Sequence, residues 1–272
     1  MALTEDTFIS HLVELRDRLM RALIAIAIAF ALIGFWPTYG VIYDFLALPL
    51  IKTLPVGSKM IATGVITPFL IPLKVGLMAA FLLVLPYVLY QAWAFVAPGL
   101  YSHEKKLVLP LVISSTILFI VGVAFCYYFV FGQLFAFIAG FAPASITPAP
   151  DIEQYLSFVM TMFLAFGVAF EVPVAIIVLV RMGVVSIKQL REFRGYFVVC
   201  ASIAAAVVTP PDVVSMLALL IPMCLLYEAG IIAASLITKV KAPEEKTDAV
   251  VAADAAAQDF AAVEKEQNSA KS

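Results

Sequence analysis

The sequence predicts an all-α integral membrane protein with six transmembrane helices. Three observations lead to this prediction: the composition, the spacing of the apolar stretches and the uneven placement of the basic residues. Of the 272 residues, 64% are hydrophobic and only 13% are charged, and the mean hydropathy is +1.06. Soluble globular domains contain about 45–50% apolar and about 25% charged residues. The composition therefore places the chain among polytopic membrane proteins.

The first predicted element is an amphipathic helix over residues 4–21. Phe8, Leu12, Leu15 and Leu19 recur at helical spacing and form an apolar stripe opposite a charged face. Such a helix can lie at a membrane surface. We expect it to continue into the first span, about residues 22–36.

The remaining spans follow a Pro- and Gly-rich loop, residues 37–72, in which residues 43–54 are expected to form a short interfacial helix. The fifth span has only 15 residues, about 22 Å of helix, which is shorter than the hydrocarbon layer of about 30 Å. It forms a short hairpin with the sixth. The membrane core is residues 1–238, and the tail, residues 239–272, is expected to be disordered and cytoplasmic. The five further spans are predicted at about 73–96 (with a kink at Pro86), 107–131, 155–180, 195–209 and 213–237.

The orientation follows from the lysines and arginines. In the six-span arrangement, 14 of the 17 basic residues fall on the side that holds both termini. The opposite side holds only Lys52, Lys59 and Lys74. Because cytoplasmic segments carry the excess of positive charge, both termini are predicted to be cytoplasmic.

The fourth span contains one charged residue, Glu171, two positions before Pro173. An acid at membrane depth costs on the order of 3 kcal/mol or more, so it usually faces a protein interior or a wet cavity. Proline removes one helical hydrogen bond and bends the helix beside the acid. We interpret Glu171 as an intramembrane working group. The alternative is a structural carboxyl that is protonated or bonded to a neighbouring helix.

The sequence offers no catalytic machinery. Its two histidines, His11 and His103, lie in predicted cytoplasmic segments, and no zinc-protease, P-loop, dinucleotide-binding or serine-hydrolase motif is present. The three cysteines lie in apolar stretches and suit neither a disulfide framework nor a metal site. We therefore predict a protein that is not an enzyme and that uses no cofactor and no metal.

Two acids stand out on the basic cytoplasmic side, Glu14 and Glu104. Phe95, Pro98 and Leu100 place apolar surface beside Glu104. A carboxylate backed by apolar surface suits a guanidinium that must be held through two hydrogen bonds. The alternatives are local: Glu14 can pair with Arg18 at i,i+4, and Glu104 with Lys105 or with the dipole of the following helix.

Five segments, taken in order, resemble the TatC family, the six-span core subunit of the twin-arginine protein translocase. The similarity extends over roughly residues 5–238. The segments are FISHLVELRDRL (8–19), PFLIPLK (68–74), YQAWAFVAPGLYSHEKK (90–106), YLSFVMTMFLAFGVAFEVPVAI (155–176) and TPPDVVS (209–215).

The resemblance implies a receptor and scaffold for the export of folded proteins across the bacterial inner membrane, driven by the proton-motive force. Glu14 and Glu104 would bind the paired arginines of a signal peptide, and Glu171 would face the concave side of a glove-shaped bundle. The implied partners are TatB- and TatA-like single-span subunits docking on the last two spans, further copies of the chain and the lipid bilayer, with no nucleic acid. Further residues implied to shape the signal-peptide site are His11, Arg16, Phe95, Pro98 and Leu100.

The sequence departs from the family pattern at two places. Met216 stands where many relatives have a glutamine, so a polar contact to a partner helix would be lost or would fall to Thr209 or Ser215. Lys105–Lys106 replaces an arginine pair, which keeps the charge and loses the planar fork.

Two other functions are compatible with parts of the sequence. A proton-coupled carrier of small solutes could use Glu171, but no internal repeat of the kind that many carriers contain is visible. A membrane-embedded enzyme lacks a nucleophile or a metal-ligand set. The paired cytoplasmic acids and the short final hairpin favour the receptor.

Overall fold

The computed structural model describes residues 2–35, 39–54, 60–96, 108–141, 149–209 and 212–237, which are almost entirely helical. Within these ranges the extended pairing is limited to one bridge between Ile61 and Asp151. The helices are α1 (Ala2–Phe35), α2 (Tyr39–Ile51), α3 (Thr67–Leu83), α4 (Leu85–Val96), α5 (Val108–Phe125), the π-helix η3 (Cys126–Val130), α6 (Phe131–Phe141), α7 (Ile152–Phe170), α8 (Val172–Arg181), α9 (Ile187–Glu192), α10 (Arg194–Val208) and a last helix, Val213–Ile237.

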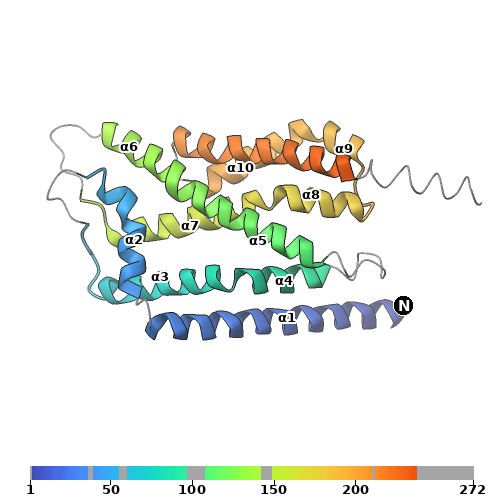
Figure 1. The fold of residues 1–272 in the computed structure, drawn as a ribbon, viewed down its shortest axis with the longest axis horizontal. Coiled ribbons are helices and arrows are strands. Elements are labelled where there is room, and N and C mark those ends of the chain that lie inside the picture. The colour runs from blue at the N-terminus through green and yellow to red at the C-terminus, as the bar shows by residue number, and fades with distance from the viewer. Residues whose placement is uncertain are drawn as a thin grey trace, which may run out of the picture.

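The long helices lie side by side along one axis, and α2 lies across one end of them (Figure 1). The start of α1, the end of α4 and α9 lie at the opposite end (Figure 1). We call this second end the basic end, because Arg181, Lys188 and Arg191 lie on α8 and α9 there.

Four helical stretches among the described residues are long and apolar enough to cross a membrane, and the bent pair α3–α4 makes a fifth if it is one span. The chain is therefore a multi-pass membrane protein. At 15 residues, α10 is shorter than these stretches, as the sequence predicted for the fifth span. The count of six spans remains a prediction.

The predicted surface helix and first span form one uninterrupted helix, α1, of 34 residues. Leu12, Leu15 and Leu19 of the apolar stripe are between 43% and 56% exposed, so this chain leaves the stripe uncovered. Farther along, Ala29 and Ile33 are buried against Ala80 of α3. The second half of the helix thus buries one face against α3.

The second predicted span is broken into α3 and α4 at Val84, with a bend of 60°. The break falls two residues before Pro86, where the sequence predicts the kink. The proline ring crowds the carbonyl four residues earlier, which explains why the helix breaks just ahead of it.

The third predicted span is longer than expected. Instead of ending near residue 131, the helical stretch from Leu109 runs to Gly140, so the predicted loop 132–153 begins as helix α6. Phe131 and Leu134 are fully buried, and this burial stabilises the extension. A stretch of 32 residues is about 48 Å long, so it crosses a layer of about 30 Å only with tilt or overhang. Figure 1 shows α5 and α6 running obliquely across the bundle.

The core is centred on α7. Val159, Met162 and Phe166 are fully buried, within a cluster that also takes buried residues from α2, α3, η3, α6, α10 and the last helix, and partly buried ones from α5. Gly167 allows close approach of α5, because a Cβ at this position would come within 2.3 Å of the Phe119 ring. The central position of α7 fixes the depth of Glu171, the residue that follows it.

Hydrogen bonds tie the end of the molecule opposite the basic end. Asp151 caps α7 by accepting bonds from the backbone N–H groups of Glu153 and Gln154, and it also accepts bonds from the N–H and hydroxyl of Thr63. The Tyr155 hydroxyl donates to the Leu46 carbonyl at 2.7 Å and so holds α2 across the bundle. The bonds of Asp151 to Thr63 and of Tyr155 to Leu46 join residues 88 and 109 positions apart, and no pattern in the sequence predicts them.

Candidate functional site

The basic end brings Glu14 of α1 beside α4. Arg18 donates from Nε (2.9 Å) and Nη2 (2.6 Å) to the same Glu14 oxygen, Oε1. The second oxygen, Oε2, accepts no hydrogen bond among the described residues and lies 3.9 Å from His11 Nδ1. The Glu14 side chain is 35% exposed. Glu14 therefore already holds one guanidinium and presents a second oxygen to an approaching cation.

Residues of α4 form the wall of this site. The Phe95 ring stacks on His11, with centroids 4.5 Å apart. The Gln91 side chain is buried, and its Oε1 lies 3.5 Å from Arg18 Nη1, a long hydrogen bond. The structure thus brings together His11, Glu14 and Phe95 as expected, and adds Gln91, which the sequence analysis did not identify.

Arg16 does not join this group. Its guanidinium pairs with the neighbouring Asp17 at 2.8 Å, and both side chains are exposed. Three further predicted residues, Glu104, Pro98 and Leu100, lie outside the described residues. The two segments that flank them, the end of α4 and the start of α5, both lie at the basic end (Figure 1).

Glu171 occupies the turn between α7 and α8. Both of its carboxyl oxygens are buried, and neither has a hydrogen-bond partner among the described residues. Pro173 follows in the first turn of α8, and Gly230 of the last helix lies against its backbone. The sequence predicted the coincidence of acid and proline at one break. The interpretation as a working group and the alternative of a structural carboxyl, protonated or bonded to a neighbouring helix, both remain predictions.

A partly buried polar pair lies next to this acid. The Trp93 indole N–H donates to Ser115 Oγ at 2.9 Å, and Ser115 is completely buried. The Ser115 hydroxyl is close enough to Glu171 to interact with it, yet it does not meet hydrogen-bond geometry. Trp93 and Ser115 come from α4 and α5, so their meeting could not be read from the sequence.

The final hairpin uses its polar groups internally. The Thr209 hydroxyl donates to the Ala205 carbonyl at 2.9 Å, and Thr209 is buried. Ser215, which is fully buried, donates through its N–H and hydroxyl to the Asp212 carboxylate. Met216 packs against the core. Both hydroxyls donate their protons within the hairpin and keep acceptor lone pairs. The predicted partner contact of Thr209, Ser215 and Met216 remains a prediction.

The comparison with known families agrees with this architecture. A family model described as Sec-independent protein translocase protein (TatC) matches residues 10–222. The chain belongs to the TatC family. It is a component of the Sec-independent protein translocase.

Curated relatives carry the same name. TatC of Haemophilus influenzae is 49% identical over 226 residues, covering 83% of this chain and 88% of the relative. TatC of Escherichia coli K12 is 48% identical over 229 residues, covering 84% and 88%. TatC of Halothiobacillus neapolitanus is 47% identical over 234 residues, covering 86% of this chain. The matched part spans only 63% of that last relative's length.

Solved structures confirm the all-α membrane fold. A crystal structure of the twin arginine translocase receptor TatC superposes with a TM-score of 0.73 at 36% identity, covering 84% of this chain and 99% of the other. A second crystal structure of this receptor, in DDM, gives 0.73 at 35% identity, covering 82% and 99%. The family predicted from the five sequence segments is therefore confirmed.

Proposed function

We propose that this TatC-family chain is the signal-peptide receptor and scaffold of its translocase, binding the two arginines of a substrate's signal at the basic end. One observation carries the proposal: Glu14 already accepts two hydrogen bonds from a guanidinium and keeps one oxygen available. Charge-assisted bonds of this kind are about twice as strong as neutral ones. Glu104, in the adjoining segment, would supply the second carboxylate.

The geometry suggests how the ligand enters. Arg18 can shift from Glu14 toward Gln91, whose buried Oε1 is already 3.5 Å from Arg18 Nη1. A signal arginine then binds the available Oε2 of Glu14 and the vacated Oε1, while Phe95 and His11 offer a stacked ring surface beside it. The exchange replaces one guanidinium by another, so Glu14 remains neutralised throughout. Lysine cannot reproduce the planar fork, and a Lys-Lys signal should bind poorly.

The same proposal sets the orientation. The basic end faces the cytoplasm of the bacterial inner membrane, with both termini on that side, because cytoplasmic segments carry the excess of lysine and arginine. Single cysteines at two exposed positions test this orientation after the three native cysteines are removed. A cysteine at Lys52 should react with an impermeant thiol reagent from outside the cell, and one at Lys188 should not. The reverse pattern would contradict the placement of Glu14.

Export itself requires partners. We propose that TatB- and TatA-like single-span subunits dock against α10 and the last helix, that several copies of the chain assemble, and that the proton-motive force drives transport. The short α10 supports this docking, because a 15-residue helix leaves the bilayer locally mismatched and favours association with other helices. The chain would act through binding and not through catalysis.

Crosslinking tests the receptor function. A signal peptide carrying a photoreactive group next to its Arg-Arg pair should crosslink to the end of α4, and the Lys-Lys peptide should not. Asp17→Asn is the matched control for Glu14→Gln, because Asp17 is an exposed acid three residues along the same helix whose partner is Arg16. Loss of the crosslink is expected for Glu14→Gln alone. Equal crosslinking by both variants would refute the proposal.

A further inference from the structure

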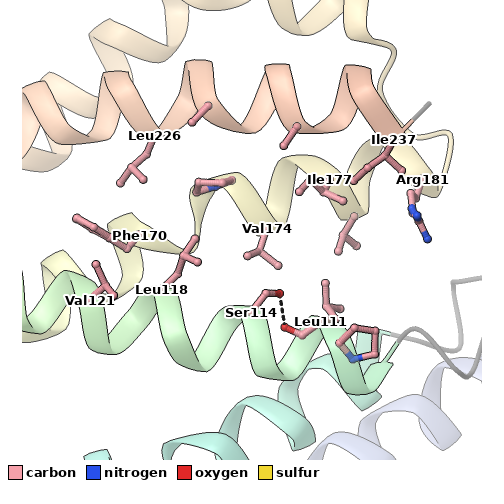
Figure 2. Close-up of a pocket in the computed structure, with 15 residues that line it drawn as sticks. Leu111, Ser114, Leu118, Val121, Phe170, Val174, Ile177, Arg181, Leu226 and Ile237 are labelled. Carbon is pink, nitrogen blue, oxygen red and sulfur yellow. Dashed lines mark hydrogen bonds between the residues drawn. The ribbon is translucent and has the colours of Figure 1, made fainter. Parts of the chain in front are cut away.

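A groove of about 610 Å³ lies between α5, α8 and the last helix, away from Glu14 (Figure 2). Its walls are almost wholly apolar. The one hydroxyl in its lining, Ser114, donates to the Leu111 carbonyl and is not free. Figure 2 shows Phe170 at one end of the groove and Arg181 at the other.

Arg181 is the single charged residue in this lining. It is exposed, and it forms no ion pair or hydrogen bond with any described residue. As the last residue of α8 it also complements the partial negative charge of a helix C-terminus. That role needs only proximity, so its guanidinium donors remain available to an anion.

The length of the groove identifies the occupant. The lining residues extend from Pro110 to Val121 on α5, from Phe170 at the end of α7 to Arg181 at the end of α8, and from Leu226 to Ile237 on the last helix. Each set covers 11 residue steps, or about 16 Å of helix. That length is about half of a hydrocarbon layer of ~30 Å, the depth of one leaflet. A transmembrane partner helix would need a groove about twice as long.

We propose that this groove binds an acidic phospholipid of the leaflet at the basic end, with an acyl chain along the apolar walls and the phosphate on Arg181. The guanidinium pairs with a phosphate through parallel N–H···O bonds. Basic pockets between membrane helices on the cytoplasmic side are suited to acidic headgroups. The positive charge of Arg181 also disfavours the basic signal peptide as the occupant. The proposal does not depend on the receptor function.

Native mass spectrometry of the full-length protein in detergent tests the site, with phosphatidylglycerol or phosphatidylcholine added as the probe. We expect one phosphatidylglycerol to be retained in preference to phosphatidylcholine. Arg181→Gln should weaken retention about tenfold, the loss expected for a charge-assisted hydrogen bond. Arg181→Lys should keep most of it. Arg191→Gln is the control, because Arg191 is an exposed cation on α9 that does not line the groove.

A second pair of variants tests the groove without changing charge. Ala233→Phe fills the groove and should weaken phosphatidylglycerol retention. Ile232→Phe changes the adjacent exposed residue, which does not line the groove, and should leave retention unchanged. Equal retention of the two lipids, or equal effects of Arg181→Gln and Arg191→Gln, would overturn the proposal. It would also be overturned if Ala233→Phe kept the lipid and instead lost crosslinks to a single-span subunit.

Discussion

Glu14 and Glu171 are two acids of one membrane protein in opposite surroundings. Glu14 lies partly exposed at the basic end, and its Oε1 accepts hydrogen bonds from the Arg18 guanidinium. Glu171 lies inside the bundle with both oxygens buried and unbonded among the described residues. A partnered acid near water is ready to exchange one cation for another. An unpartnered buried acid is destabilising when ionised, so the fold retains it at a cost.

Under the proposed function, Glu14 binds the signal and Glu171 acts at a later step of transport. In that proposal, Glu14 can be replaced only by another group that accepts a guanidinium. Glu171 has no hydrogen-bond partner among the described residues, so we propose that it acts when water or another helix reaches it. The same side-chain chemistry would then serve two purposes, according to its surroundings.

The largest expected effect is on signal binding. Glu14→Ala should weaken the affinity for an Arg-Arg signal peptide by about ten- to a hundredfold, because each charge-assisted bond contributes on the order of 1.5–3 kcal/mol. Because Glu104 would serve the same ligand, the double variant should lose less than the sum of the single losses. Titration of purified protein with a fluorescent signal peptide measures this affinity. An unchanged affinity in Glu14→Ala would remove the receptor site from this end.

Glu171 should show the complementary pattern. Glu171→Leu should reduce transport about tenfold, the effect of losing one charge-assisted bond that the acid would form with water or another helix during transport, and leave signal-peptide affinity within about twofold. Glu171→Gln keeps hydrogen-bonding capacity and should be mild. Transport into membrane vesicles measures the first quantity. Normal transport by the Leu variant would make the acid a purely structural group and would end the functional contrast with Glu14.

Arg18 is the cation that occupies Glu14. If it occupies Glu14 until a signal arrives, Arg18→Gln should increase signal affinity by about two- to fivefold, since partly exposed ion pairs contribute about 0.2–1 kcal/mol. Arg16→Gln is the control, because Arg16 pairs with Asp17. A decrease in affinity for Arg18→Gln would mean that Arg18 orders Glu14 and does not compete for it.

The smallest effect concerns a third acid, Asp151, at the opposite end. Hydrogen bonds from Thr63 and from the start of α7 lower the pKa of Asp151 below its ordinary value of 3.8. A lowered folded-state pKa stabilises the protein above the unfolded value, and this contribution is lost as the pH falls through the folded value. Thr63→Val should therefore lower the melting temperature slightly at neutral pH, with the difference shrinking below about pH 4. A difference that grows in acid would contradict this sign.

Much of the fold can be predicted from the sequence, because membrane helices are recognised by the length and apolarity of their segments. The bend near Pro86 and the shortness of α10 both depend on local covalent or compositional features, which short-range reasoning captures. The extension of the third span through α6 escaped that reasoning. Its residues are apolar enough for either a helix or a buried loop. The burial of Phe131 and Leu134 stabilises the helix.

Composition and helical periodicity are enough to predict the membrane class, the break at Glu171 and the concentration of basic residues at one end. Which groups meet depends on how the helices pack. Gln91 reached Arg18, and Trp93 reached Ser115 beside Glu171, across gaps of 73 and 22 residues. The groove of Arg181 likewise needs three helices to enclose it. Contacts between helices depend on how the helices pack and on their crossing angles, and the spacing of residues along one chain does not predict either.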